Sequence, residues 1–431
     1  MPPRPVPNRI LRYAYAGSLG HHGGMRLRGA VLIVIVALAL SGCGKSTAHW
    51  NGAGGGNLND GGKVAALISE PKDGATDVPA SVEITYQTRN AKSATVEVTN
   101  AGTGAKVDGG PRPDGSSWVP MQALRYGMKY TAKVTATGAD GKTVTSIATF
   151  TTMAEPGNTS HMISNMGDGQ VYGVGAPIVL TFTKSIPKAA WPAVQRRLFV
   201  QSTPQQEGIW NWFSDREVHY RPKDPWQVGT KISIQALFRG VPLGDGRYGD
   251  DDLSIDASVV TSALRIEIDD ASKSLTVTQD GKVVRTVKAS LGKATTPSSS
   301  GNMVVMTRAT QEIFDSSTSG IPVNSPGGYR ETVFYPLRLT WGGQYIHAAP
   351  WSVGQQGRFD VSHGCTNVSP DDAKWLYDNT HIGDPVTVKN TGSPLKWGDG
   401  WTDWNISWDE YVKGSAIPYT PGPAAPSPAT S

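Results

Sequence analysis

The sequence has 431 residues, enough for roughly three domains of about 150 residues each. It contains 50 glycines and 30 prolines, only 18% of its residues are charged, and its net charge of +4 is spread without a basic block. This charge pattern gives no indication of nucleic-acid binding, and short alternating runs rich in Thr, Val and Ser favour a mainly β protein.

The N-terminal region carries the pattern of an export signal. Arg26 and Arg28 precede an apolar run over residues 30–40, which is too short to span a bilayer comfortably, and small residues lead to Cys43. We predict a signal peptide over residues 1–42, with Met25 as an alternative start. The stretch "LSGC" resembles the bacterial lipobox, which implies diacylation of Cys43 and a lipid anchor in the cell membrane, facing the periplasm or cell wall. A plain secretory signal is the alternative.

Export changes the meaning of the second cysteine, Cys365. Thiols outside the cytoplasm tend to be oxidised in pairs. The sequence has two cysteines, so a lipid on Cys43 leaves Cys365 without a partner. A lone thiol in an oxidising compartment suggests a functional role.

Two similar β-modules are predicted after a glycine-rich tether at residues 43–63. Short alternating strands separated by Asn, Gly and Asp clusters are typical of a β-sandwich. The stretch "ISEPKDG" at residues 68–74 recurs as "ISNMGDG" at residues 163–169. We therefore predict tandem immunoglobulin-like modules, the first over residues 64–153 and the second over residues 154–261.

The second module contains a stretch with two chemical interpretations. "GDGRYGD" at residues 244–250 has the glycine spacing of a dinucleotide-binding turn, but no helical periodicity follows, which favours a turn-rich loop. The aspartates at residues 250–252 form either a calcium site or, as we prefer, a solvated loop.

A third, β-rich domain is predicted over residues 262–390. Its strands include a hairpin that turns at Asp280 and Gly281, and a helix is expected after Ser369 because serine caps helices well and proline suits the first helical position. Residues 391–414 carry four tryptophans three or four positions apart. We expect them to pack against a neighbouring domain, with carbohydrate stacking as the alternative. Residues 415–431 are predicted to be a disordered tail.

The candidate chemistry lies in the third domain, at His347, His363 and Cys365. A histidine within hydrogen-bond reach can take the proton of a cysteine thiol and return it to a leaving amine, as in cysteine–histidine acyl transfer. Gly364 allows an unusual backbone conformation, in which the amides of Gly364 and Cys365 could face a developing oxyanion. Zinc ligation, with Asp360 nearby, and a purely structural role are the alternatives.

Two motifs make the domain recognisable. "IHAAPW" and, eighteen residues from histidine to cysteine, "SHGCTNVSP" resemble the catalytic domain of L,D-transpeptidases, the YkuD-type fold. "TPSSSGNMVV" and "DSSTSGIPVNSPGGYR" are also similar to mycobacterial members, in which two immunoglobulin-like modules precede the catalytic domain and a tryptophan-bearing segment follows. The resemblance covers roughly residues 64–412.

The resemblance implies an acyltransferase that needs no cofactor or metal. Its partners would be two peptidoglycan stem peptides, a donor and an acceptor. A cysteine attacks the donor at meso-diaminopimelate, releases D-alanine, and passes the acyl group to the second stem as a 3→3 cross-link. Carbapenems would acylate the same cysteine. An L,D-carboxypeptidase and a catalytically inactive wall-binding lipoprotein are the alternatives.

The resemblance also assigns roles residue by residue. Cys365 would be the nucleophile and His347 the general base and acid, while His363 and Gly364 would help to build the oxyanion site. The expected substrate-binding residues are Tyr329, Gly342, Gly343, Ser362 and Asn367. The sequence departs from the common family pattern at Phe314 and Thr366, which affects the pocket shape but removes no chemical group that the mechanism needs.

Overall fold

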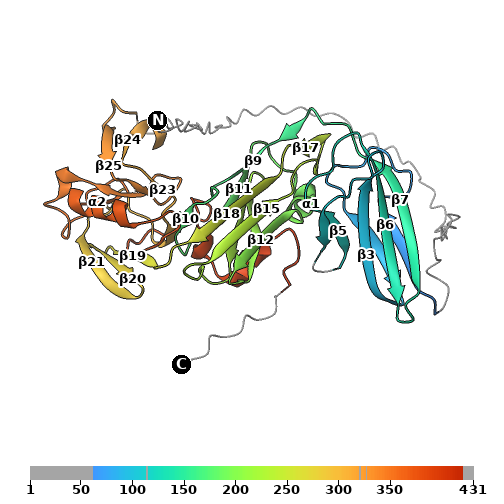
Figure 1. Cartoon of the computed structure of the whole chain (residues 1–431). Coiled ribbons are helices and arrows are strands. Elements are labelled where there is room, and N and C mark those ends of the chain that lie inside the picture. The colour runs from blue at the N-terminus through green and yellow to red at the C-terminus, as the bar shows by residue number, and fades with distance from the viewer. Residues whose placement is uncertain (1–61, 113–114, 320–321, 327, 421–431) are drawn as a thin grey trace, which may run out of the picture. The chain divides into compact units, whose positions relative to one another are not determined.

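The computed structural model describes residues 62–112, 115–319, 322–326 and 328–420. The predicted signal peptide, Cys43, most of the tether and the end of the tail lie outside these residues. The described part contains twenty-nine strands and three short α-helices, so the prediction of a mainly β protein is confirmed (Figure 1). None of its helices is long and apolar enough to cross a membrane.

The first β-module consists of two antiparallel sheets with strand orders β1-β2-β5-β4 and β3-β6-β7. Every second side chain of β6 is buried, and strands of both sheets contribute to one apolar cluster that includes Ile84, Trp118 and Phe150. The strands are β1 (Ala65–Glu70), β2 (Ile84–Arg89), β3 (Ala91–Asn100), β4 (Gly109–Pro111), β5 (Ser117–Pro120), β6 (Lys129–Gly138) and β7 (Thr143–Thr151).

The second module has sheets with strand orders β10-β18-β15-β12, β13-β14-β11-β9 and β16-β17-β8, around a larger apolar cluster. Its elements are β8 (Thr159–Ser160), β9 (Met162–Ser164), β10 (Val171–Tyr172), β11 (Ile178–Phe182), η1 (Lys188–Ala190), α1 (Trp191–Gln195), β12 (Leu198–Thr203), β13 (Gly208–Ser214), β14 (Glu217–Pro222), β15 (Lys231–Ala236), β16 (Pro242–Gly244), β17 (Arg247–Gly249) and β18 (Leu253–Val259).

The "GDGRYGD" stretch joins β16 to β17 in a hairpin, so no helix begins there and the predicted turn is observed. The nearby aspartates bind protein donors. Asp250 contacts His161 Nδ1 at 2.9 Å, and Asp252 accepts backbone amides from Ala123 and Arg239. The described residues hold no group of three or more His, Cys, Asp or Glu side chains that could bind a metal ion.

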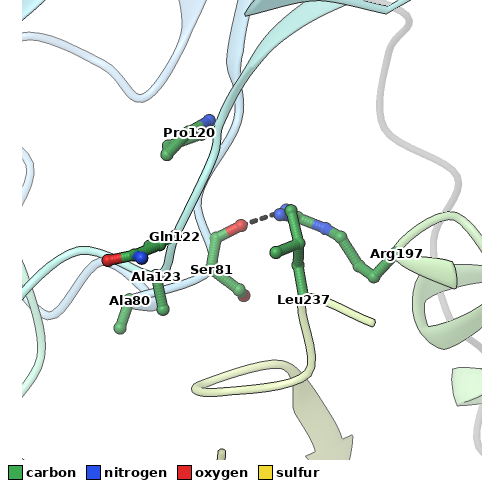
Figure 2. Close-up of a pocket in the computed structure, with 7 residues that line it drawn as sticks. All are labelled: Ala80, Ser81, Pro120, Gln122, Ala123, Arg197 and Leu237. Carbon is green, nitrogen blue, oxygen red and sulfur yellow. Dashed lines mark hydrogen bonds between the residues drawn. The ribbon is translucent and has the colours of Figure 1, made fainter. Parts of the chain in front are cut away.

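Direct contacts join the first module to the second. The Arg197 guanidinium donates to the Ser81 carbonyl, and the Ser81 hydroxyl donates to the Gly240 carbonyl at 3.0 Å. Figure 2 shows the small pocket at this junction, lined by Ala80, Ser81, Pro120, Gln122, Ala123, Arg197 and Leu237. It contains none of the predicted catalytic residues.

The third domain is built on the five-stranded sheet β21-β20-β19-β29-β22 and the four-stranded sheet β23-β26-β27-β28, with β24 and β25 as a separate pair. Its elements are β19 (Leu264–Asp269), β20 (Ser274–Gln279), β21 (Lys282–Lys288), β22 (Gly301–Val304), β23 (Thr307–Arg308), β24 (Gln311–Asp315), η2 (Ser316–Ser319), β25 (Arg330–Phe334), β26 (Leu337–Arg338), β27 (Tyr345–Ala348), η3 (Pro350–Ser352), β28 (Thr366–Val368), α2 (Pro370–Asn379) and β29 (Pro385–Lys389).

Local signals place two of these elements as predicted. Asp280 and Gly281 have φ angles of 49° and 79°, the left-handed pair of a tight hairpin turn between β20 and β21. The Ser369 hydroxyl accepts the Asp372 amide at 3.1 Å and caps α2. The buried α2 residues Ala373 and Leu376 then join the apolar core of the domain.

The C-terminal segment, residues 391–414, packs against the second module and the third domain. It contains η4 (Asp403–Asn405), α3 (Trp408–Tyr411) and η5 (Val412–Gly414). Trp401 is buried beside Val179 and Val304, and the Trp404 indole donates to the Gly175 carbonyl at 2.8 Å. The tryptophans therefore pack mainly as expected, although Trp397 remains 39% exposed.

Candidate active site

Two neighbouring strands bring the predicted base and nucleophile together. Strands β27 and β28 are parallel, and His347 pairs with Asn367 in their register. Cys365 immediately precedes β28 and therefore lies beside Tyr345, at the start of β27. A separation of eighteen residues along the chain becomes one strand across the sheet with an offset of two residues along it.

Cys365 is a free, half-buried thiol. Its Sγ donates to the Gly343 carbonyl oxygen at 3.5 Å. Burial raises the pKa of the thiol to about 12, against the opposing effect of the Tyr345 backbone amide, which hydrogen-bonds the sulfur. The cysteine is therefore protonated at neutral pH and needs a base before it can attack.

His347 is only 4% exposed. Burial lowers its pKa to about 4, although its hydrogen bond to the Ala348 carbonyl acts in the opposite direction. Nδ1 lies 2.9 Å from that oxygen, and a carbonyl can only accept, so the proton of the neutral ring is on Nδ1. Nε2 is therefore unprotonated and can act as a base.

The turn before Cys365 is held by its own serine. The Ser362 hydroxyl donates to the Cys365 carbonyl at 2.6 Å and accepts the Gly364 amide at 3.0 Å. Gly364 has a φ of +127°, a conformation that favours glycine, and its carbonyl accepts the Ser298 hydroxyl at 2.8 Å. Ser362 thus shapes the turn, and the Gly364 amide is already bonded inside it.

His363 lies away from the buried pair. Its side chain is exposed, its Nε2 is 3.2 Å from the Lys293 ammonium, and its ring stacks on Tyr329 with centroids 5.4 Å apart. Burial, followed by the Cys365 charge, raises the pKa of Tyr329. Tyr329 therefore lies near enough to Cys365 to interact electrostatically with it.

The remaining predicted residues divide into a buried and a loop group. Asn367 is 2% exposed and donates to the Ser352 hydroxyl at 3.1 Å, so it supports the loop that follows His347. Gly342 and Gly343 lie in the loop between β26 and β27, and Gly343 supplies the carbonyl that contacts Cys365.

Comparisons with known proteins identify an Ig-like part followed by a catalytic domain. Residues 75–242 match a bacterial Ig domain and residues 263–388 an L,D-transpeptidase catalytic domain. L,D-transpeptidase 2 of Mycobacterium tuberculosis is 37% identical over 354 residues, covering 82% of this chain and 85% of that protein. L,D-transpeptidase 5 of the same species is 31% identical, covering 85% and 79%. The chain belongs to the L,D-transpeptidase family.

A solved structure of M. tuberculosis L,D-transpeptidase 3 in complex with a faropenem-derived adduct is 32% identical, with 53% of this chain and 97% of that chain covered and a TM-score of 0.45. Membership makes this L,D-transpeptidase an enzyme of the peptidoglycan acyltransferase class, and its family acts on peptidoglycan peptides. The resemblance seen in the two motifs is confirmed.

The two departures from the family pattern occupy different places in this L,D-transpeptidase. The Phe314 ring lies 5.3 Å from the His347 ring and 4.5 Å from that of Tyr345, so it borders the base. Thr366 is fully buried, and its hydroxyl has no hydrogen-bond partner among the described residues. Phe314 packs directly on the base, whereas Thr366 is buried in β28 opposite Ile346.

Sequence reasoning missed three residues that support the site: Ser298, Arg338 and Asp399. Arg338 donates to the carbonyls of Thr340 and Trp341 at 2.9 Å each, and Asp399 accepts the Gly342 amide at 2.5 Å. Ser298 lies in the "TPSSSGNMVV" stretch without having been singled out, and Arg338 and Asp399 belong to no quoted motif. Only folding brings Asp399 to a loop 57 residues earlier in the chain.

Proposed function

We propose that this L,D-transpeptidase forms 3→3 cross-links in peptidoglycan through a thioester on Cys365. The donor is a tetrapeptide stem with meso-diaminopimelate at its third position, and its terminal D-alanine is released. The acceptor is the side-chain amine of a second stem. Carbapenems would acylate the same sulfur.

The first half-reaction follows from the protonation states of the free enzyme. The thiol and the imidazole are both neutral, so Sγ attacks the donor carbonyl as its proton moves to His347 Nε2. The tetrahedral intermediate collapses, the carbon–nitrogen bond breaks, and the imidazolium gives its proton to the departing amine of D-alanine. A thioester on Cys365 remains.

The second half-reaction reverses these roles. The acceptor amine attacks the thioester carbonyl and passes a proton to His347, which returns it to the Cys365 sulfur as that sulfur leaves. Because the Gly364 amide already donates to Ser362, we assign the main oxyanion contact to the Cys365 amide. His363 and Lys293 then form the polar rim of the site.

The observation that carries this proposal is the position of a protonated cysteine and a neutral histidine at neighbouring strands β28 and β27, with the histidine tautomer fixed by Ala348. A structural cysteine would not need an adjacent base with a free Nε2. An L,D-carboxypeptidase would use the same two residues, with water in place of the acceptor amine.

Incubation of the purified protein with a disaccharide-tetrapeptide, followed by mass spectrometry, separates the possibilities. We expect a cross-linked dimer and free D-alanine; tripeptide alone would indicate a carboxypeptidase, and no turnover a wall-binding scaffold. The Cys365→Ala variant should give no product and no acyl-enzyme mass. Product formed by that variant would refute the mechanism.

We further propose that lipid on Cys43 anchors the protein in the cell membrane, facing the cell wall. The apolar run and "LSGC" support this location.

A further inference from the structure

The loop over residues 340–344 sets the position of an atom that contacts the nucleophile. The Gly343 carbonyl accepts the Cys365 thiol, and the Leu339 amide donates to the Gln344 carbonyl at 2.8 Å across the base of the loop. Gly343 has a φ of +96°. A shift of this loop would therefore move the carbonyl that orients the sulfur.

Asp399 holds the loop from outside the catalytic domain. Its Oδ1 accepts the Gly342 amide at 2.5 Å. A Cβ on residue 342 would lie 2.7 Å from Oδ2 of the same carboxylate, so the close approach requires glycine. Arg338 holds two carbonyls of the loop, and Asp399 holds the amide that follows them.

The backbone around Asp399 is itself closely fitted. Gly400 has a φ of +99°, and a Cβ there would lie 2.8 Å from Met306 Sδ and 3.1 Å from the Leu339 carbonyl. The next residue, Trp401, is buried with Met306 in an apolar cluster. The carboxylate is thus presented to Gly342 from a well-packed turn.

The same segment is fastened to the second module. Asp403 is fully buried and accepts from His219 Nδ1 at 3.0 Å and from the Tyr411 hydroxyl at 3.0 Å. A continuous path therefore runs from β14 of the second module through Asp403 and Asp399 to Gly342, Gly343 and the nucleophile.

We propose that Asp399 is a positioning residue for catalysis: by holding the Gly342 amide, it fixes the Gly343 carbonyl that orients the Cys365 sulfur toward the donor. This role rests on the proposed function, in which Cys365 is the nucleophile. A misplacement of the reacting atom of about 1 Å can reduce a rate by about 100-fold, so one charge-assisted hydrogen bond at this point can control turnover.

The test compares Asp399→Ala, Asp399→Asn and Asp409→Asn in the purified protein, with kcat and KM measured for the tetrapeptide donor. We expect Asp399→Ala to lower kcat by about 10- to 100-fold with KM nearly unchanged. Asparagine keeps an acceptor for the Gly342 amide and should retain activity within about threefold of the wild type. Asp409 is exposed on the same segment, so Asp409→Asn controls for the lost charge and should match the wild type.

A double-mutant cycle tests whether Asp399 acts through Gly342, and it remains informative if Asp399→Ala alone folds poorly. In Gly342→Ala the new methyl group displaces the carboxylate, so kcat should fall. Adding Asp399→Ala to that background should cause little further loss, because the interaction is already broken. Fully additive losses would overturn the proposal.

Two further outcomes are decisive. Wild-type kcat in Asp399→Ala, or equal losses of activity and thermal stability in the alanine and asparagine variants, would overturn the positioning role.

The acyl-enzyme mass separates the positioning role of Asp399 from the proposed function. Normal acylation of Cys365 in both wild type and Asp399→Ala would refute this inference alone, whereas a wild-type enzyme without acyl-Cys365 would refute the proposed function.

Discussion

At the scale of single residues, the pair formed by Cys365 and His347 differs from a preformed thiolate–imidazolium pair. Burial moves both pKa values in the direction that favours the neutral form: that of the thiol rises to about 12, and that of the imidazole falls to about 4. Little thiolate is present before substrate binds. Such a site protects a cysteine from unspecific alkylation and oxidation.

The pH dependence of alkylation should show this difference. Because the thiol pKa is raised, the rate of Cys365 modification by iodoacetamide in the folded protein should still be rising at pH 9 and above, without a plateau. The same reaction in urea should level off near the pH of an ordinary cysteine, about 8.5. Mass spectrometry of samples quenched over time gives both profiles. A plateau below pH 8 in the folded protein would contradict the neutral pair.

At the scale of elements, the C-terminal segment is held by a buried charged cluster. His219 is fully buried between Asp403 and Glu217, which it contacts at 3.0 and 2.6 Å. Burial alone would lower the pKa of His219, but the two carboxylates outweigh it and raise the pKa to about 9. The protonated histidine therefore joins β14 to the segment that carries Asp399.

This cluster predicts a loss of stability at alkaline pH. A histidine whose folded pKa of about 9 exceeds its unfolded value of about 6.5 stabilises the fold fully below pH 6.5, and that contribution disappears between pH 6.5 and 9. The shift corresponds to about 3 kcal/mol at most. The melting temperature should fall across this window in the wild type, and His219→Gln should be less stable at pH 6 with a flatter profile.

The matched control for that measurement is His161→Gln. His161 also contacts an aspartate, Asp250, but its side chain is 56% exposed, and an exposed pair contributes little to stability. This variant should keep the wild-type pH profile. If His219→Gln kept the wild-type dependence of melting temperature on pH, the buried cluster would not be the cause of the loss of stability at alkaline pH.

At the scale of the whole molecule, the order of segments along the chain is compatible with the proposed lipid anchor. In the sequence, the glycine-rich residues 43–63 and two β-modules come between Cys43 and the catalytic domain.

Cell fractionation tests the anchor. The Cys43→Ser variant lacks the sulfur that would carry the lipid, so it should move from the membrane fraction to the soluble fraction or the medium. The control is Cys365→Ser, which also replaces a cysteine sulfur with oxygen. This variant should stay in the membrane fraction. Membrane retention of Cys43→Ser would refute the lipid anchor.

Local sequence signals accounted for much of the fold. Asp280–Gly281 and Ser369 acted as predicted because a turn or a helix cap depends on a few adjacent residues. The position of His363 was less predictable: the motif suggested a part in the oxyanion site, but the ring is exposed beside Lys293 and Tyr329. Which way a side chain leaves a turn depends on neighbours from distant segments.

By itself, the sequence determined the β-rich class and the family, because periodicity and close motifs are local properties of the chain; it also predicts the export signal and the reacting pair. The tertiary structure alone decided the protonation states and the support of the site. Burial of Cys365 and His347 exists only after the strands pair, and Asp399 reaches Gly342 only because the C-terminal segment packs back across the catalytic domain. Desolvation and long-range hydrogen bonds have no signature in a local stretch of sequence.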